Sequence, residues 1–138
     1  MTTHQQTLTL RTTGRGTTEI TNEVAAAVAR SGVQSGLLHV FVRHTSCSVL
    51  ITENADPSVR GDLETLAGRW APDGDSAYMH GTEGDDDMAA HARSVLAGTS
   101  VTVPVGGGKM LLRTWQGIFL WEHRARGHTR EIVVTVLS

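Results

Sequence analysis

Three histidines, His44, His80 and His91, lie in polar stretches of the chain whose residue types suit a site of chemistry. His44 begins the stretch HTSCSVLITENADP, His80 ends SAYMH, and His91 lies within EGDDDMAAHARSVLAG. Neutral imidazole is the commonest side-chain metal ligand, and three imidazoles with water or a carboxylate suit zinc or a similar divalent ion. The segments are distant in sequence, so a shared site requires tertiary folding. The alternative is that each imidazole serves only a local hydrogen bond.

Carboxylates accompany the second and third histidines. Asp87 lies four residues before His91, and on a helix residues with this spacing touch. A carboxylate that orients a ligating imidazole is common around metals, so we expect Asp87 to act in catalysis, with Asp87 or Glu83 supporting the metal. The alternative is that Asp85, Asp86 and Asp87 only stabilise a helix start, with Asp87 as the N-cap.

A second polar cluster follows an apolar stretch at Glu53-Asn54-Ala55-Asp56-Pro57. Strand ends beside helix starts are common positions for sites. We expect Glu53 to act in catalysis and Asn54 to bind a ligand, whereas Asp56 is mainly a cap. Arg60 lies in the first turn of the helix that follows, where a cation is unfavourable to the helix dipole. We therefore expect Arg60 to pair with a carboxylate or an anion.

Trp115 and Gln116 are candidates for substrate binding, because Trp can stack on a ring and Gln can hydrogen-bond the edge of a heterocycle. The alternative for Trp115 is packing in the core or against another subunit. Downstream, Arg124 is a catalytic candidate and Arg130 a substrate-binding one. Guanidinium groups bind phosphate and pyrophosphate oxygens through paired hydrogen bonds. The alternative is a charged, solvated hairpin turn.

The only cysteine, Cys47, follows His44 by three residues and invites comparison with a nucleophile. Side chains three apart on a strand face opposite sides, so a small buried cysteine is the preferred interpretation. One cysteine also excludes an intrachain disulfide and fits a reducing compartment.

Length and charge limit the class of protein. The chain has 138 residues, which fits one domain over 1–138, and a formal net charge of −2, which argues against nucleic-acid binding. It lacks an N-terminal apolar core typical of a signal peptide and an apolar run of about 20 residues that could span a bilayer. We therefore expect a cytoplasmic protein without membrane partners.

Periodicity and turn residues predict the elements that position these side chains. Strands are expected over 5–13, 37–42, 47–52, 99–103, 109–121 and 130–137, with a short strand ending at residue 20 and a hairpin at 106–108. Helices are expected over 22–30 (capped by Thr21 and ended by Gly32), from Asp56-Pro57 with Leu63 and Leu66 inward, and over 88–97 with Met88, His91 and Val95 inward. Gly117 suggests a bulge. Without a regular βαβ order, the pattern predicts an α+β fold with a mostly antiparallel sheet or sandwich and two or three helices.

The segments HTSCSVLITENADPSVRGDLE, YMHGTEGDDDMAAHARSVLAG and KMLLRTWQGIFLWEHR resemble the YjbQ-like family, also called the secondary thiamine-phosphate synthase group. The resemblance covers nearly the whole chain and implies an α+β fold and a homotrimer. It also implies a divalent ion, often zinc, held near a subunit boundary by His44, His80 and His91. Arg113 before TWQ, Cys47 and the DDDMAAH loop depart from the family pattern but leave the histidines intact.

The resemblance implies a metal-assisted enzyme acting on a small phosphorylated heterocycle. The named candidate is thiamine-phosphate synthesis from a thiazole phosphate and a pyrimidine diphosphate, with pyrophosphate leaving. Zinc is the expected ion, with magnesium as the alternative for a diphosphate substrate. Two rivals stay open: a metal-dependent hydrolase of phosphoesters or esters, and a non-catalytic trimer that binds a small ligand or metal.

Overall fold

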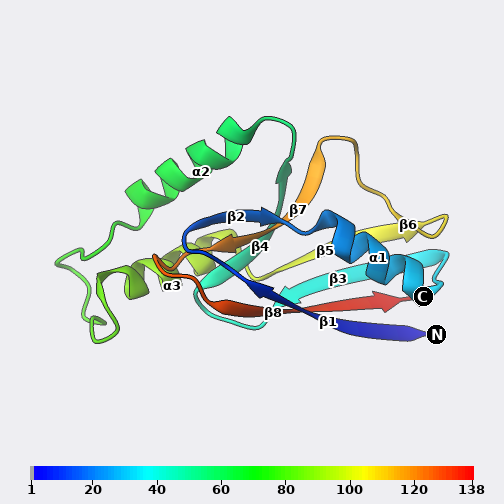
Figure 1. Cartoon of the computed structure of the whole chain (residues 1–138), viewed down its shortest axis with the longest axis horizontal. Helices are drawn as coiled ribbons and strands as arrows, with labels where there is room; N and C mark the ends of the chain where they lie inside the picture. Colours follow the sequence, from blue (N-terminus) through cyan, green and yellow to red (C-terminus); the bar gives the residue numbers. More distant parts are fainter. Residues whose placement is uncertain (1) are drawn as a thin grey trace.

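The computed structural model describes residues 2–138, which fold into two antiparallel sheets and three helices (Figure 1). The larger sheet has the strand order β1-β8-β3-β5-β6 and the smaller has the order β2-β7-β4. The strands are β1 (Thr3–Arg11), β2 (Gly16–Glu19), β3 (Ser35–Val42), β4 (Cys47–Glu53), β5 (Ser100–Gly106), β6 (Lys109–Met110), β7 (Gln116–Glu122) and β8 (Thr129–Leu137). The helices are α1 (Thr21–Ser31), α2 (Pro57–Trp70) and α3 (Asp85–Ala97). The predicted α+β class with antiparallel strands is confirmed.

Both sheets and α1 contribute to one apolar core. Val40 of β3, Val134 of β8, Val49 of β4 and Leu120 of β7 are almost completely buried in it, together with Val28 of α1. Alternate residues of β3 and β8 point inward, as the two-residue repeat of a strand requires. Burial of this apolar surface, at roughly 25 cal/mol per Å², holds the strand ends and loops that carry the polar side chains.

Two of the predicted helix signals are confirmed. Asp56 is the N-cap of α2, and its side chain accepts a hydrogen bond of 3.0 Å from the backbone N–H of Ser58, with Pro57 at the first helical position. Gly32 ends α1 in the left-handed conformation, with φ 69°. Thr21, by contrast, is the first residue of α1 and not its cap, because its hydroxyl bonds Glu19 and accepts from the backbone N–H of Ile118.

The prediction of one strand over 109–121 was wrong. Lys109 and Met110 form β6, which pairs with β5 through a tight turn at Gly107 and Gly108, whose φ angles are 57° and 76°. Residues 111–115 then leave the larger sheet, and β7 enters the smaller one. The apolar pattern is similar in both pieces, so it does not reveal the change of sheet.

Gly117 does not mark a bulge, because β7 pairs with β4 in an unbroken register from Gln116 to Glu122. A Cβ atom at Gly117 would lie 2.6 Å from Oε2 of Glu19. The glycine therefore allows the Glu19 side chain to approach the backbone of β7 closely.

Helix α3 begins earlier than expected and buries a different face. Its N-cap is Gly84, so Asp87 lies within the first turn and its carboxylate is not used as a cap. The buried face carries Ala89, Ala90 and Ser94, whereas Val95 is 84% exposed. The prediction that Met88, His91 and Val95 all face inward was therefore wrong. His91 lies at the edge of the buried face.

Helix α2 is also less buried than its pattern suggested. Only Ala67 is fully buried, and Leu66 is exposed. No helix within residues 2–138 is long and apolar enough to cross a membrane.

Candidate metal centre

The loop before α3 and the first two turns of α3 bring His80, Asp87 and His91 together. One donor atom from each lies within 4.8 Å of the other two. Oδ2 of Asp87 is 2.7 Å from Nε2 of His80 and 3.3 Å from Nε2 of His91. The i, i+4 spacing on α3 accounts for the second contact, whereas the 71–84 loop must fold back to make the first. This end of the molecule lies opposite both termini (Figure 1).

The backbone fixes the orientation of the His91 ring. Nδ1 of His91 lies 3.0 Å from the carbonyl oxygen of Thr45, in the β3–β4 connection. A carbonyl oxygen only accepts, so Nδ1 carries a proton, and Nε2 is the ring nitrogen that faces Asp87, with a lone pair whenever the ring is neutral. This is the arrangement that commonly holds a metal-ligating histidine.

Asp87 is buried and ionised. Burial raises the pKa of its carboxyl, but the hydrogen bond from His80 and the charges of His91 and Arg124 outweigh it, so the net shift is downward. Nη1 of Arg124 lies 3.1 Å from Oδ1 of Asp87. One carboxylate oxygen therefore faces the arginine and the other faces the two histidines.

Arg124 also joins the β7–β8 turn to α3. Its Nε donates to Asp86 at 2.8 Å, and Nη2 donates to the backbone oxygen of Glu83. The same Asp86 oxygen accepts from the backbone N–H of Ala125. The hydrogen bond from Arg124 is the largest of the influences on Asp86, and together they lower the pKa of its carboxyl to about 2. Arg124, expected to be catalytic, is thus occupied by carboxylates and positions Asp87.

His44, the third predicted ligand, does not join this group. Together with Thr45 and His91, it lines an open pocket of about 460 Å³. Nδ1 of His44 is 3.1 Å from the backbone nitrogen of Ser46 and 3.0 Å from its hydroxyl. Burial, with the charge of Arg130, lowers the pKa of His44. The imidazole is therefore neutral at physiological pH.

Glu53, Asn54 and Arg60 lie at the other end of β4, roughly 20 Å along the strand from the histidines. Oε2 of Glu53 accepts from the backbone N–H groups of Ala55 and Asp56, so Glu53 shapes the entry to α2. Arg60 donates to the backbone oxygen of Glu53 and lies over the Phe119 ring, 4.9 Å from its centre. The chain does not bring the predicted catalytic Glu53 to the histidine site.

A second pocket, of about 530 Å³, lies between α1 and the 108–116 segment. Asn54 and Gln116 line it, with Lys109 and Arg113. The side-chain oxygen of Gln116 also accepts from the backbone N–H of Arg113. Trp115, the residue before Gln116, is 62% exposed. Asn54 and Gln116, both expected to bind substrate, therefore line one pocket, which lies away from His80, Asp87 and His91 of the same chain.

Arg130, expected to bind substrate, is buried in an ion pair with Glu122. Its Nε donates to Oε1 of Glu122 at 2.8 Å, and both residues are 1% exposed. Thr12 donates to the same carboxylate at 2.7 Å. Sequence reasoning missed Glu122 as the partner. The one available signal was a charged residue directly after a run of apolar strand residues.

His123 is fully buried beside this pair. Its Nε2 lies 2.8 Å from the hydroxyl of Ser48, and Nδ1 has no hydrogen-bond partner within residues 2–138. Burial lowers the pKa of His123 to about 3. It is therefore a neutral core residue. Cys47 is likewise buried, and burial raises the pKa of its thiol to about 11, which agrees with a packing role.

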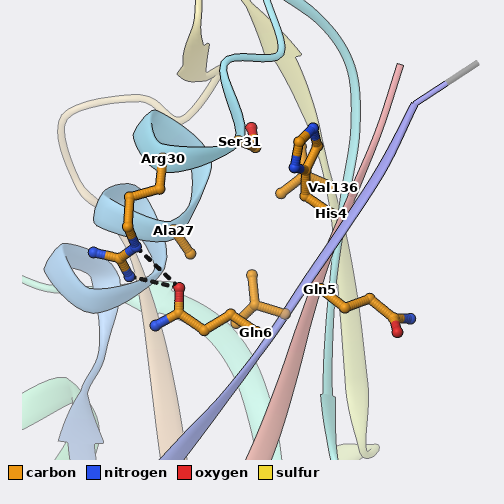
Figure 2. A pocket seen from close by; sticks show the side chains of 8 residues that line it. His4, Gln5, Gln6, Ala27, Arg30, Ser31 and Val136 are labelled. Carbon is orange, nitrogen blue, oxygen red and sulfur yellow. Dashed lines mark hydrogen bonds between the residues drawn. The ribbon is translucent and has the colours of Figure 1, made fainter.

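Figure 2 shows a smaller pocket of about 170 Å³ between α1 and the edge strand β1. Both Nε and Nη2 of Arg30 donate to Oε1 of Gln6 across it, at 3.1 and 2.6 Å. The Arg30 guanidinium is therefore already hydrogen-bonded, and the pocket lies at the end of the fold remote from His80 and His91.

The fold and this group of side chains define a class: two-sheet α+β proteins with a histidine and carboxylate site at one end. The family model described as UPF0047 protein YjbQ-like matches residues 6–138, and the chain belongs to this YjbQ/UPF0047 family. A UPF0047 protein of Synechocystis sp. is 48% identical over 133 residues, covering 96% of this chain and 90% of the relative. UPF0047 protein YjbQ of Escherichia coli O157:H7 is 43% identical over 134 residues, covering 96% of each.

Solved structures agree with the fold. An uncharacterized conserved protein of the same family from Clostridium acetobutylicum has a TM-score of 0.88 at 34% identity, covering 96% of this chain and 99% of that one. A hypothetical protein from Aeropyrum pernix K1 has a TM-score of 0.89 at 26% identity, covering 98% of each chain. These names state no activity, so the function is argued from the site.

Proposed function

We propose that this protein is a metal-assisted enzyme acting on a small phosphorylated compound, with a divalent cation held by His80, Asp87 and His91. One observation carries the proposal. Nε2 of His91 lies 3.3 Å from Oδ2 of Asp87, while Nδ1 of His91 is committed to Thr45, so when the ring is neutral Nε2 and the carboxylate face each other with lone pairs. A divalent ion held between them would use these lone pairs together with a donor atom of His80.

The donor set favours zinc. Two imidazoles and one carboxylate are typical of catalytic zinc sites, which keep one position for water or substrate. A zinc ion bound there would activate a water molecule and polarise a phosphoryl oxygen. Magnesium fits less well because it prefers oxygen donors.

The surroundings favour an anionic substrate. Arg124, Arg126 and His128 line a pocket of about 450 Å³ that adjoins the metal centre through Asp86. The Arg126 guanidinium makes no side-chain hydrogen bond or ion pair within the described part of the chain, so it is available to a phosphate. Glu83 on the same wall carries the opposite charge and disfavours a highly charged ligand at that edge.

Thiamine-phosphate synthesis is one candidate reaction, but one observation favours hydrolysis as a second. Within one chain the heterocycle-binding candidates Asn54, Trp115 and Gln116 lie far from the histidines, so the metal centre alone offers a site for one phosphorylated substrate and water. A reaction of two substrates would require residues from a neighbouring subunit. Turnover of a generic phosphoester without a second substrate would support hydrolysis, whereas product formation only from both thiamine precursors would support the transferase.

The direct test is metal content. Purified protein reconstituted with zinc should hold about one ion per chain by elemental analysis, and zinc should raise its melting temperature. His80→Ala and His91→Ala should lose both effects, whereas the control His39→Ala, on the far side of the larger sheet, should keep them. Equal zinc content in all four proteins would refute the proposal.

We also propose that the chain self-associates as a homotrimer in the cytoplasm. Large apolar side chains on the loop before α3 and on α3 itself support self-association, since Met79 is fully exposed and Leu96 is 63% exposed. Light scattering coupled to size-exclusion chromatography would give the mass directly. A monomer at micromolar concentration would contradict this part of the proposal.

A further inference from the structure

The buried Glu122–Arg130 ion pair is connected by hydrogen bonds to His44, which lines the pocket of about 460 Å³. A fully buried ion pair is weak evidence for stability, because desolvation of both charges opposes their attraction. Here Nη2 of Arg130 has a further partner, the hydroxyl oxygen of Ser46, at 3.0 Å. Guanidinium only donates, so this bond uses a lone pair of the hydroxyl and leaves its single proton for another acceptor.

That acceptor is Nδ1 of His44, 3.0 Å from the Ser46 hydroxyl oxygen. The backbone N–H of Ser46 points at the same ring nitrogen, at 3.1 Å. A backbone N–H can only donate, so Nδ1 of His44 is the acceptor in both contacts and carries no proton. The proton of the neutral ring is therefore on Nε2.

This tautomer is the opposite of the one that His91 adopts. Nε2 of His91 offers a lone pair to a metal, whereas Nε2–H of His44 offers a proton to an acceptor. The described part of the chain provides no hydrogen-bond partner for Nε2 of His44, and the ring lines the pocket it shares with His91. To bind a metal through Nε2, His44 would carry its proton on Nδ1 and would lose the hydrogen bond from the backbone N–H of Ser46.

We infer that His44 is not a metal ligand but the hydrogen-bond donor for an oxyanion, most simply a phosphoryl oxygen, bound in the pocket that His44 shares with His91. Ser46, Arg130 and Glu122 are positioning residues that fix its tautomer. This inference rests on the proposed function, because His91 supplies the metal side of the same pocket.

The protonation of His44 can be read directly. In protein labelled with ¹⁵N in histidine and loaded with zinc, the His44 signals, identified by their loss in His44→Gln, should show hydrogen on Nε2 and none on Nδ1. A spectrum with hydrogen on Nδ1 and a metal-bound Nε2 would overturn the inference. In Ser46→Ala the fraction with hydrogen on Nδ1 should rise. An unchanged tautomer in a folded Ser46→Ala variant would remove Ser46 from the positioning role.

Binding of inorganic phosphate to the zinc-loaded protein provides the second test, by titration calorimetry. His44→Phe keeps a planar aromatic ring without a donor, and phosphate affinity should fall about tenfold, the loss expected for a hydrogen bond to a charged acceptor. His44→Gln places an amide N–H near the position of Nε2 and should restore affinity to within about threefold. Unchanged affinity in His44→Phe, or no rescue by His44→Gln, would overturn the inference.

Zinc content separates this inference from the proposed function. Both His44 variants should keep about one zinc per chain, whereas His80→Ala should lose it. Loss of zinc in both His44 variants would make His44 a ligand and would overturn only the inference. Retention of zinc in His80→Ala would refute the metal centre itself, whatever the His44 variants do.

Discussion

Asp87 and Arg124 form an ion pair in which a single carboxylate oxygen, Oδ1, faces Nη1 of Arg124 at 3.1 Å. The other oxygen, Oδ2, is left to His80 and His91. Because the arginine also holds Asp86, the carboxylate is fixed between a permanent cation and the two imidazoles. The proposed metal centre therefore depends most on Asp87.

Asp87→Asn should weaken zinc binding at least tenfold, because the isosteric amide lacks the negative charge that the cation and both histidines face. Competition with a chromophoric chelator measures the affinity. The matched control is Asp85→Asn, two residues earlier on the same helix and outside the group. If both variants bind zinc as tightly as the native chain, Asp87 is not a ligand.

Glu122→Gln should lower the free energy of unfolding by about 3 kcal/mol, because it leaves the buried Arg130 charge without its counter-ion. The control is Glu131→Gln, which removes an exposed carboxylate 3.6 Å from Arg43 and should cost less than about 1 kcal/mol. Urea unfolding monitored by fluorescence gives both values. Similar losses in the two variants would contradict the role assigned to burial.

Acid should destabilise the fold through His123. Its pKa is about 3 in the folded chain, against 6.5 for an ordinary histidine, so between these values the unfolded state binds more protons. Stability therefore rises with pH through this window and is lost as pH falls below about 6.5, by up to about 1.4 kcal/mol per pH unit from this group.

His123→Gln should reduce that slope, since glutamine does not titrate. Urea unfolding at several pH values between 4 and 7 provides the measurement, on metal-free protein. His39→Gln, which changes a histidine bonded to Thr102 at the surface, is the control. A slope identical in native protein and His123→Gln would show that another group dominates.

Cys47 should not react with a thiol reagent in the folded protein at pH 8. Burial raises the pKa of its thiol to about 11, and the side chain has no exposed surface. Labelling with iodoacetamide, followed by mass spectrometry, should become fast only in unfolding concentrations of urea. Rapid labelling without urea would indicate an accessible, activated thiolate.

Local interactions explain why much of the fold could be read from the sequence. Asp56-Pro57 starts α2, Gly32 ends α1 and the glycines after Gly106 turn the chain, because each acts on hydrogen bonds or backbone angles within a few residues. The contact between Asp87 and His91 was predictable for the same reason, since both lie on one helix four residues apart.

Other features depend on which strands become neighbours. The break of 109–121 into strands of two sheets leaves no mark in the alternation of apolar residues, and the three aspartates before His91 are equivalent by sequence, so the true start of α3 was missed. The burial of Arg130 is unpredictable for a similar reason: a guanidinium near a strand start gives no sign in the sequence that it will be buried.

The sequence by itself determined the class of fold, the family and the side chains able to bind a metal. Only the tertiary structure decided that His80 joins Asp87 and His91, that Arg130 meets Glu122, and that Nδ1 of His44 accepts from the backbone N–H of Ser46. The physical reason is that residue type fixes what a side chain can donate or accept, whereas its partner is set by the packing of distant segments around the common core.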